Sequence, residues 1–264
     1  MIKIENVCKT FNEGTINEKK ALIDINLELA EGDFVTVIGG NGAGKSTLLN
    51  LIAGVYDVDV GHIYLDKLDV TNEKEFVRAE YLGRVFQDPM MGTAANMEIE
   101  ENLALAFRRG KKRTLGWGIT QVERSEYTQK LTMLGLGLET RMKTKVGLLS
   151  GGQRQALTLL MATLKKPKLL LLDEHTAALD PKTAKKVLEL TEKIVTREHL
   201  TTFMVTHNMK EAIRHGNRLI MMNEGRIIYD VGGEEKRNLQ VSDLLKKFET
   251  VNEEGVVNDR MLLG

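Results

Sequence analysis

The chain has 264 residues, 42% of them hydrophobic, and its 37 lysines and arginines balance its 37 aspartates and glutamates. This length suits one large domain, or a core with a smaller lobe. Zero net charge argues against a nucleic-acid or anionic-membrane partner, because both attract basic proteins. The single cysteine, Cys8, excludes a disulfide within the chain and fits a reducing compartment.

The sequence carries no recognisable targeting or membrane-spanning signal. Its start, Met1 to Glu5, lacks the basic residues and apolar stretch of a signal peptide. Its longest purely apolar runs, such as Leu169 to Leu172, fall far short of the ~20 residues that cross a bilayer. We therefore expect any link to a membrane to run through another protein.

The beginning of the chain predicts three strands and one helix. The second strand alternates apolar and polar residues, as in a half-exposed antiparallel strand, and the third is apolar and β-branched, as in a buried strand. The polar segment 12–20 predicts a loop, and Gly54 ends the helix. The strands are expected at residues 2–7, 23–29 and 34–38, and the helix at 45–53.

The segment from about residue 88 to 160 predicts a helical lobe inserted into the core. Residues 98–107 and 123–134 have the spacing of amphipathic helices, and no strong strand pattern occurs between them. A short basic run, Arg108 to Arg113, lies in the middle, with Trp117 nearby. Such a run is typical of a solvated loop, and contact with lipid headgroups or a partner is the alternative.

Alternation of strands and helices then returns, which implies a mainly parallel sheet covered on both faces. Helices are expected at residues 152–165, 182–196 and 209–214, strands at 169–173 and 201–206, and a hairpin at 218–229. The charged end of the chain predicts one helix, 242–249, and a tail. The expected organisation is one domain at 1–233, followed by a C-terminal helix and tail at 234–264.

A glycine-rich segment follows the third strand. The residues Gly39-Gly40-Asn41-Gly42-Ala43-Gly44-Lys45-Ser46, with Thr47 next, fit the P-loop pattern G-x-x-x-x-G-K-[ST]. Glycines let backbone N–H groups approach phosphate closely, and the following helix directs the positive end of its dipole to the same point. We expect the segment to bind ATP, with Lys45 on the β- and γ-phosphates and Ser46 on Mg²⁺.

Two carboxylates end the apolar run at 169–172. Asp173 and Glu174 follow a buried strand, at the edge where ligands bind in open parallel sheets. We expect Asp173 to hold Mg²⁺, directly or through water, and Glu174 to accept a proton from the attacking water or to orient it. Without the P-loop upstream, two acids that end a core strand and begin a turn would be the simpler interpretation.

Between these motifs lies Leu149-Ser150-Gly151-Gly152-Gln153, and with it the sequence resembles the ATP-binding cassette family from about Ile2 to Tyr229. The resemblance implies an α/β fold: a P-loop NTPase, RecA-like core with a mainly parallel sheet, an N-terminal antiparallel β subdomain and an inserted helical subdomain. It also implies a homodimer in which each ATP lies between the P-loop of one copy and Ser150 to Gln153 of the other. Ordinary helix capping by Ser150 is the simpler alternative.

Further positions match the family one by one. The resemblance implies that Phe11 stacks on adenine, although a phenylalanine near a strand is often a core residue. It implies that Gln87 touches Mg²⁺ and the attacking water, and couples the helical lobe to the ATP. Asp180, in Ala178-Leu179-Asp180, matches the loop that signals across the dimer, and His207 matches the histidine that contacts the γ-phosphate.

Three segments depart from the usual family pattern. His175 stands where proline is common, and we expect it to alter the turn without stopping hydrolysis. The residues at 154–163 differ from the family's commonest helix sequence after Gln153. Val58 to Gly61 stand where the family more usually has a turn that contains proline or serine. These departures indicate a less typical branch and weaken any transfer of a substrate.

The resemblance implies the ATPase subunit of a transporter, peripheral on the cytoplasmic side of the cell membrane. Import of a small organic solute, such as an amino acid, through separate transmembrane permease subunits is favoured, with an extracytoplasmic substrate-binding protein in the full system. Met90 and Met91 are candidate permease contacts, because methionines adapt to varied surfaces, and packing inside the lobe is the alternative.

Other cassette proteins are the alternatives. An exporter ATPase remains open, since exporters share the same motifs. A cassette protein that acts on DNA or ribosomes is disfavoured, because the interval from Lys45 to Asp173 leaves no room for a long coiled coil and the net charge is zero. A regulatory protein without turnover is disfavoured by the intact Glu174 and His207.

Overall fold

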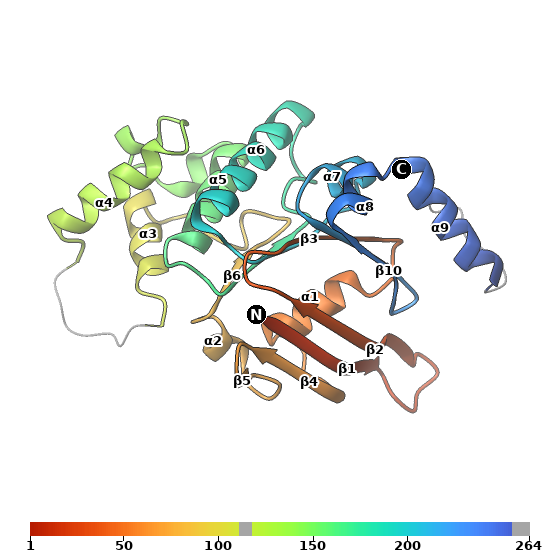
Figure 1. Cartoon of the computed structure of the whole chain (residues 1–264). Helices are drawn as coiled ribbons and strands as arrows, with labels where there is room; N and C mark the ends of the chain where they lie inside the picture. Colours follow the sequence, from red (N-terminus) through yellow and green to blue (C-terminus); the bar gives the residue numbers. More distant parts are fainter. Residues whose placement is uncertain (111–117, 255–264) are drawn as a thin grey trace. The chain divides into compact units, whose positions relative to one another are not determined.

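The computed structural model describes residues 1–110 and 118–254, and the chain forms two compact units (Figure 1). Unit 1 contains Met1–Arg78 and Thr201–Gly264, and unit 2 contains Ala79–Leu200. Part of the basic run singled out above, together with Trp117, lies outside the described residues. Within the described ranges, no helix has the length and apolarity needed to cross a membrane.

Unit 1 begins with an antiparallel sheet. Its strand order is β2-β1-β4-β5, with β1 at Ile2–Phe11, β2 at Lys19–Leu29, β4 at Val60–Leu65 and β5 at Leu68–Asp69. In β2, buried Ile25, Leu27 and Leu29 alternate with exposed polar residues, which confirms the half-exposed strand. The loop expected at 12–20 is shorter, because β2 already starts at Lys19, and the strand expected at 2–7 is longer, because β1 continues to Phe11.

A second sheet region in unit 1 carries the P-loop. β3 (Phe34–Gly39) lies between β8 (Thr202–Val205) and β9 (Arg218–Asn223) and runs parallel to both. β10 (Arg226–Gly232) pairs antiparallel with β9 and forms the expected hairpin. Because β3 is flanked on both sides, its first five residues are all buried, as its β-branched composition predicts.

Four helices accompany this sheet in unit 1. Helix α1 follows β3 directly, and its bounds agree with the prediction, whereas the end of the chain forms two helices rather than the single one expected. The hydrophobic core around β9 includes Leu219 and Met221 and takes Leu244 and Phe248 from the last helix. The helices are α1 (Lys45–Ala53), α7 (Met209–Arg214), α8 (Gly233–Asn238) and α9 (Val241–Glu254).

A short helix, α2 (Glu75–Arg78), ends unit 1's first segment and supports α1 through one buried cation. The Arg78 side chain is 1% exposed, and its Nη1 donates to the carbonyls of Leu51 (2.7 Å) and Ile52 (3.0 Å) near the end of α1. Its Nη2 and Nε donate to Thr71 O and Glu73 O, both at 2.9 Å. The guanidinium therefore adds donors to carbonyls in the last turn of α1, where Leu51 O also accepts a bond from Gly54 N at 3.1 Å.

The described part of unit 2 combines one parallel strand pair with four α-helices. β6 (Leu82–Val85) and β7 (Leu169–Asp173) are parallel, so parallel pairing occurs in both units and the α/β fold class is confirmed. The helices share a core of buried residues that includes Leu103, Tyr127, Leu131 and Leu157. They are α3 (Ile99–Phe107), α4 (Gln121–Thr132), α5 (Gly151–Thr163) and α6 (Pro181–Glu198), with short 3₁₀ turns at Leu138–Thr140 and Val146–Leu148.

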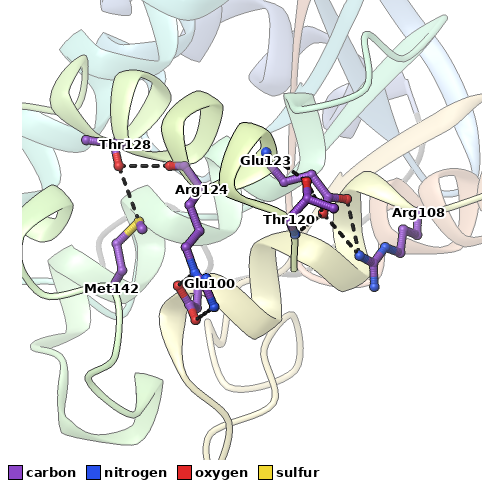
Figure 2. A network of polar contacts seen from close by, with 7 residues as sticks. All are labelled: Glu100, Arg108, Thr120, Glu123, Arg124, Thr128 and Met142. Atoms are coloured by element: carbon purple, nitrogen blue, oxygen red, sulfur yellow. Dashed lines mark hydrogen bonds and ion pairs between the residues drawn. The ribbon is translucent and has the colours of Figure 1, made fainter. Parts of the chain in front are cut away.

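A polar network fastens α3 and α4 together in unit 2 (Figure 2). The Arg124 guanidinium contacts both carboxylate oxygens of Glu100, at 3.0 and 3.1 Å, and Glu100 is only 5% exposed. Thr120 and Glu123 cap the start of α4, and the backbone N–H of Thr120 is the main reason why the pKa of Glu123 lies below its usual value. Arg108 donates to the same carboxylate. The helical lobe is thus held by charge-assisted bonds as well as by its core.

Candidate functional site

The P-loop in unit 1 is packed so tightly that the fold requires glycine at positions 39 and 44. Gly44 begins α1 at φ 100°, and a Cβ there would lie 2.7 Å from both Ala21 O and Leu22 Cδ2. A Cβ on Gly39 would lie 2.4 Å from Met222 O, whereas one on Gly40 would meet nothing within 4 Å. The loop is therefore packed against β2 and β9 but open at Gly40, where a ligand can approach the backbone.

Lys45 lies inside this loop. Its side chain is 5% exposed, and Nζ donates to the carbonyls of Gly39 (2.7 Å) and Gly40 (2.9 Å). Ser46, Asn41 and Gly42 are exposed. A buried ammonium at a helix N-terminus, surrounded by accessible backbone, is the arrangement that binds phosphate.

Two further predicted residues lie in unit 1. Phe11 ends β1 and is half-buried, with its ring edge-on to Tyr56 at a centroid distance of 5.2 Å and an interplanar angle of 79°. It is therefore not enclosed in the core, and Lys9 Nζ lies over the same ring, 5.6 Å from its centroid. His207 follows β8 and is exposed.

The carboxylate pair lies in unit 2, where β7 ends. Asp173 Oδ2 is 3.7 Å from Arg84 Nη2. Glu174 adopts φ 45°, a left-handed conformation that a residue with a side chain rarely takes, and its carbonyl accepts a bond from Ala177 N at 2.9 Å. His175 is 2% exposed, and its Nε2 lies 3.1 Å from Thr191 Oγ1 on α6. The buried His175 side chain therefore anchors the turn to α6. This contact is how His175 affects the turn in place of the more common proline.

Gln87 follows β6 in unit 2 and is exposed. Asp88 accepts a bond from Met90 N at 2.8 Å and so fixes the turn that comes next. The side chains of Met90 and Met91 are 46% and 70% exposed, so they do not pack inside the lobe. An amide side chain and an apolar surface therefore lie within one short segment.

Ser150 begins α5 and caps it. Its hydroxyl accepts a bond from Gln153 N at 3.3 Å, and Gln153 Oε1 accepts one from Ser150 N at 3.2 Å, which confirms helix capping. A Cβ on Gly152 would lie 2.1 Å from Thr183 Cγ2, so α6 approaches closely there. The same Thr183 bonds to Asp180 at the start of α6, and this holds the pKa of the Asp180 carboxyl below its usual value.

The predicted residues are thus divided between the two units. Unit 1 holds Phe11, the P-loop and His207, and unit 2 holds Gln87, Ser150 to Gln153, Asp173, Glu174 and Asp180. Across residues 1–110 and 118–254, no group of three or more His, Cys, Asp or Glu side chains is arranged to hold a metal ion. Arg78, Tyr56 and Thr183 were not singled out from the sequence, because each occurs in a segment without a motif and only its packing shows its contribution.

Comparison with known proteins agrees with these motifs. The sequence model of the family described as ABC transporter matches residues 22–177, a range that includes the P-loop, Gln87, Ser150, Asp173 and Glu174. A tyrosine transport ATP-binding protein of Clostridioides difficile is 45% identical over 249 residues, which cover 94% of this chain and 99% of that protein. A phosphonates import ATP-binding protein of Lactococcus lactis is 31% identical over 256 residues, covering 94% and 99%.

Solved structures show the same likeness. A dimeric ATP-binding cassette in a post-hydrolysis state, bound to ADP and Pi, has a TM-score of 0.74 and 30% identity over 88% of this chain and 98% of that one. ATP binding and hydrolysis follow for this chain from the family model, the relatives and this neighbour. The chain belongs to the ABC transporter family and is an ATP-binding, ATP-hydrolysing subunit.

Proposed function

We propose that two copies of this chain close head to tail over two ATP molecules and thereby energise solute import through separate membrane subunits. The observation that carries the proposal is the presence of two anion-binding helix starts in one chain. One is the P-loop with its buried Lys45, and the other is the start of α5 at exposed Ser150. Each ATP would lie between the P-loop of one copy and Ser150 to Gln153 of the other, and a solved dimeric cassette supports such pairing.

Within each site, Lys45 would hold the β- and γ-phosphates and Phe11 would stack on adenine. Ser46 and Asp173 fit Mg²⁺, because hydroxyl and carboxylate oxygens suit this hard ion, which keeps only a few protein ligands beside phosphate and water. When bound, Mg²⁺ would neutralise charge that develops on the phosphates. Gln87 would touch both the ion and the attacking water.

Glu174 would accept a proton from the attacking water or orient it. Its backbone, at φ 45°, is held by a turn that His175 ties to α6 through Thr191, so the carboxylate starts from a fixed position. His207, exposed after β8, would donate to the γ-phosphate. Asp180 lies at the start of α6, the helix that approaches Gly152, and would signal across the dimer from one copy to the other.

The transport function rests on partners. We propose transmembrane permease subunits that contact Met90 and Met91, a position on the cytoplasmic side of the membrane, and an extracytoplasmic substrate-binding protein. Relatives with transport names include spermidine/putrescine and sulfate/thiosulfate import proteins. The 45% identity to a tyrosine transport protein over nearly the whole of both chains supports an amino acid as cargo, with tyrosine the first to test.

The test is transport in reconstituted vesicles. The chain would be co-purified with its membrane partners and reconstituted, and uptake of radiolabelled tyrosine would be measured with and without Mg-ATP. We expect ATP-dependent accumulation with the wild type and none with Glu174→Gln. ATP-driven efflux would favour the exporter alternative, and an ATPase that co-purifies with no membrane protein would favour a non-transport cassette protein.

A further inference from the structure

Lys19, the first residue of β2, extends over the P-loop. Its Nζ lies 3.5 Å from the point where a Cβ on Gly42 would be, and Gly42 is an exposed residue of the loop at φ 81°. Lys19 is not part of the P-loop motif, and the hairpin between β1 and β2 brings it there. All of these residues belong to unit 1.

The strand register explains the position of this side chain. Lys19 is directly opposite Phe11 in the antiparallel pair of β1 and β2. Side chains of directly opposite residues project from the same face of a sheet, with Cβ atoms about 4.5–5.5 Å apart. Phe11 and Lys19 therefore share one face. The next residue, Lys20, is opposite Thr10 and projects from the other face.

No acidic side chain neutralises this ammonium. Within residues 1–110 and 118–254, the Lys19 side chain makes no hydrogen bond or ion pair, whereas nearby Lys9 pairs with Asp59 at 2.6 Å. The adjacent Glu18 directs its carboxylate to Gly14 N, at 2.9 Å. A positive charge therefore stands beside exposed Gly42 of the loop, in addition to the buried ammonium of Lys45.

We propose that Lys19 is a second phosphate-binding cation, which donates to the phosphates of a nucleotide whose base stacks on Phe11. The anion is then held by Lys45 from within the loop and by Lys19 from the solvent side. This inference rests on ATP binding at the P-loop, as proposed above, and adds a residue to that site. An ammonium close to phosphate forms charge-assisted bonds, which are stronger than neutral ones.

The test compares two neighbouring lysines. Dissociation constants for ATP, ADP and adenosine are measured by calorimetry for the wild type, Lys19→Ala and Lys20→Ala. We expect Lys19→Ala to weaken ATP and ADP about tenfold, which equals about 1.4 kcal/mol, and to leave adenosine unchanged. Its affinity for ATP should also depend less on salt concentration. Lys20→Ala should bind all three ligands as the wild type does.

Three results would contradict the inference, and they show whether the role of Lys19 or the proposed function is wrong. One result would overturn only the role of Lys19: Lys19→Ala binds ATP as tightly as the wild type does, while Lys45→Ala loses ATP binding. Equal weakening of ATP and adenosine would show that Lys19 only supports the strand. Failure of the wild type itself to bind ATP would contradict the proposed function, and with it this inference.

Discussion

The turn that carries Glu174 depends on one buried side chain. Thr191 Oγ1 donates its proton to Val187 O at 2.8 Å, so it must accept from His175 Nε2, 3.1 Å away. His175 therefore carries its proton on Nε2. A proline at this position would stiffen the turn through its ring, whereas His175 fastens the turn to α6 by a hydrogen bond.

Thr191→Val should destabilise the protein by about 1–3 kcal/mol, because it removes the buried hydrogen bond between His175 Nε2 and Thr191 Oγ1 at nearly constant volume. Urea denaturation measures the change. Thr196→Val, an exposed position on the same helix, serves as the control and should stay within about 0.5 kcal/mol of the wild type. Equal stability of Thr191→Val and the control would show that this bond does not hold the turn.

Tyr127 gives a second prediction for single residues. Its ring is fully buried in the core of the helical lobe, and its hydroxyl has no hydrogen-bond partner among the residues that the structure describes. Burial raises the pKa of Tyr127 to about 12. At pH 7, the free energy of unfolding of Tyr127→Phe should therefore equal that of the wild type or exceed it by up to about 2 kcal/mol. The substitution removes a polar group that has no hydrogen-bond partner.

The sign of the pH dependence follows from the raised pKa. Between pH 10 and about 12 the unfolded chain releases the tyrosine proton while the folded chain keeps it, so wild-type stability falls with rising pH. Tyr127→Phe should lose less stability over this window, with Tyr81→Phe as the control. A parallel decline of wild type and Tyr127→Phe would contradict this account.

At the scale of elements, α1 depends on a cation far from it in sequence. Burial lowers the pKa of Arg78, and its guanidinium donates four hydrogen bonds to backbone carbonyls, two of them in the last turn of α1. Arg78→Ala should cost about 2–4 kcal/mol, since it removes four buried hydrogen bonds at once, although Leu51 O keeps its bond from Gly54 N. Arg78→Lys should lie in between, because an ammonium cannot reproduce the planar fork.

Chemical denaturation would measure both variants. Lys74→Ala is the matched control, since Lys74 is an exposed cation of the same segment whose ion pair with Asp57 is long, at 3.8 Å. It should change stability by no more than about 0.5 kcal/mol. Arg78→Ala with the stability of Lys74→Ala would show that α1 does not need this cap.

The elements differ in how far the sequence predicts them. α1 and β7 are predicted to the residue, because local signals bound them: a glycine-rich start and Gly54 for the helix, an apolar run and Asp173 for the strand. β6 is not predicted, since its four residues include Gly83 and Arg84 and become a strand only through pairing with β7. β4 is not predicted either, and it forms through its pairing with β1.

The site shows the same division. Motif residues such as Lys45, Ser150 and Glu174 are marked by residue type and spacing alone. Contacts such as those of Arg78 and Lys19 are not, because each depends on a fold that brings a residue without a motif to a loop or helix end. The left-handed backbone conformation at Glu174 likewise cannot be predicted from the sequence, because the residue at this position is not a glycine.

At the scale of the whole molecule, the proposed dimer takes the second half of each ATP site from another copy. Ser150→Arg should therefore abolish ATPase activity in the complete transporter, because the longer cation would occupy the position of the γ-phosphate at the start of α5. Phosphate release measures the rate. Full activity in this variant, with nucleotide binding intact, would contradict the role assigned to Ser150.

The central claim is that ATP itself closes the dimer and that hydrolysis reopens it. Light scattering of Glu174→Gln with Mg-ATP tests it most directly, because this variant should bind ATP and fail to split it. The account predicts a species of twice the 29.6 kDa chain mass with ATP, a monomer without nucleotide, and a monomer when Ser150→Arg is added. A species that stays monomeric with ATP, although nucleotide is bound, would contradict it.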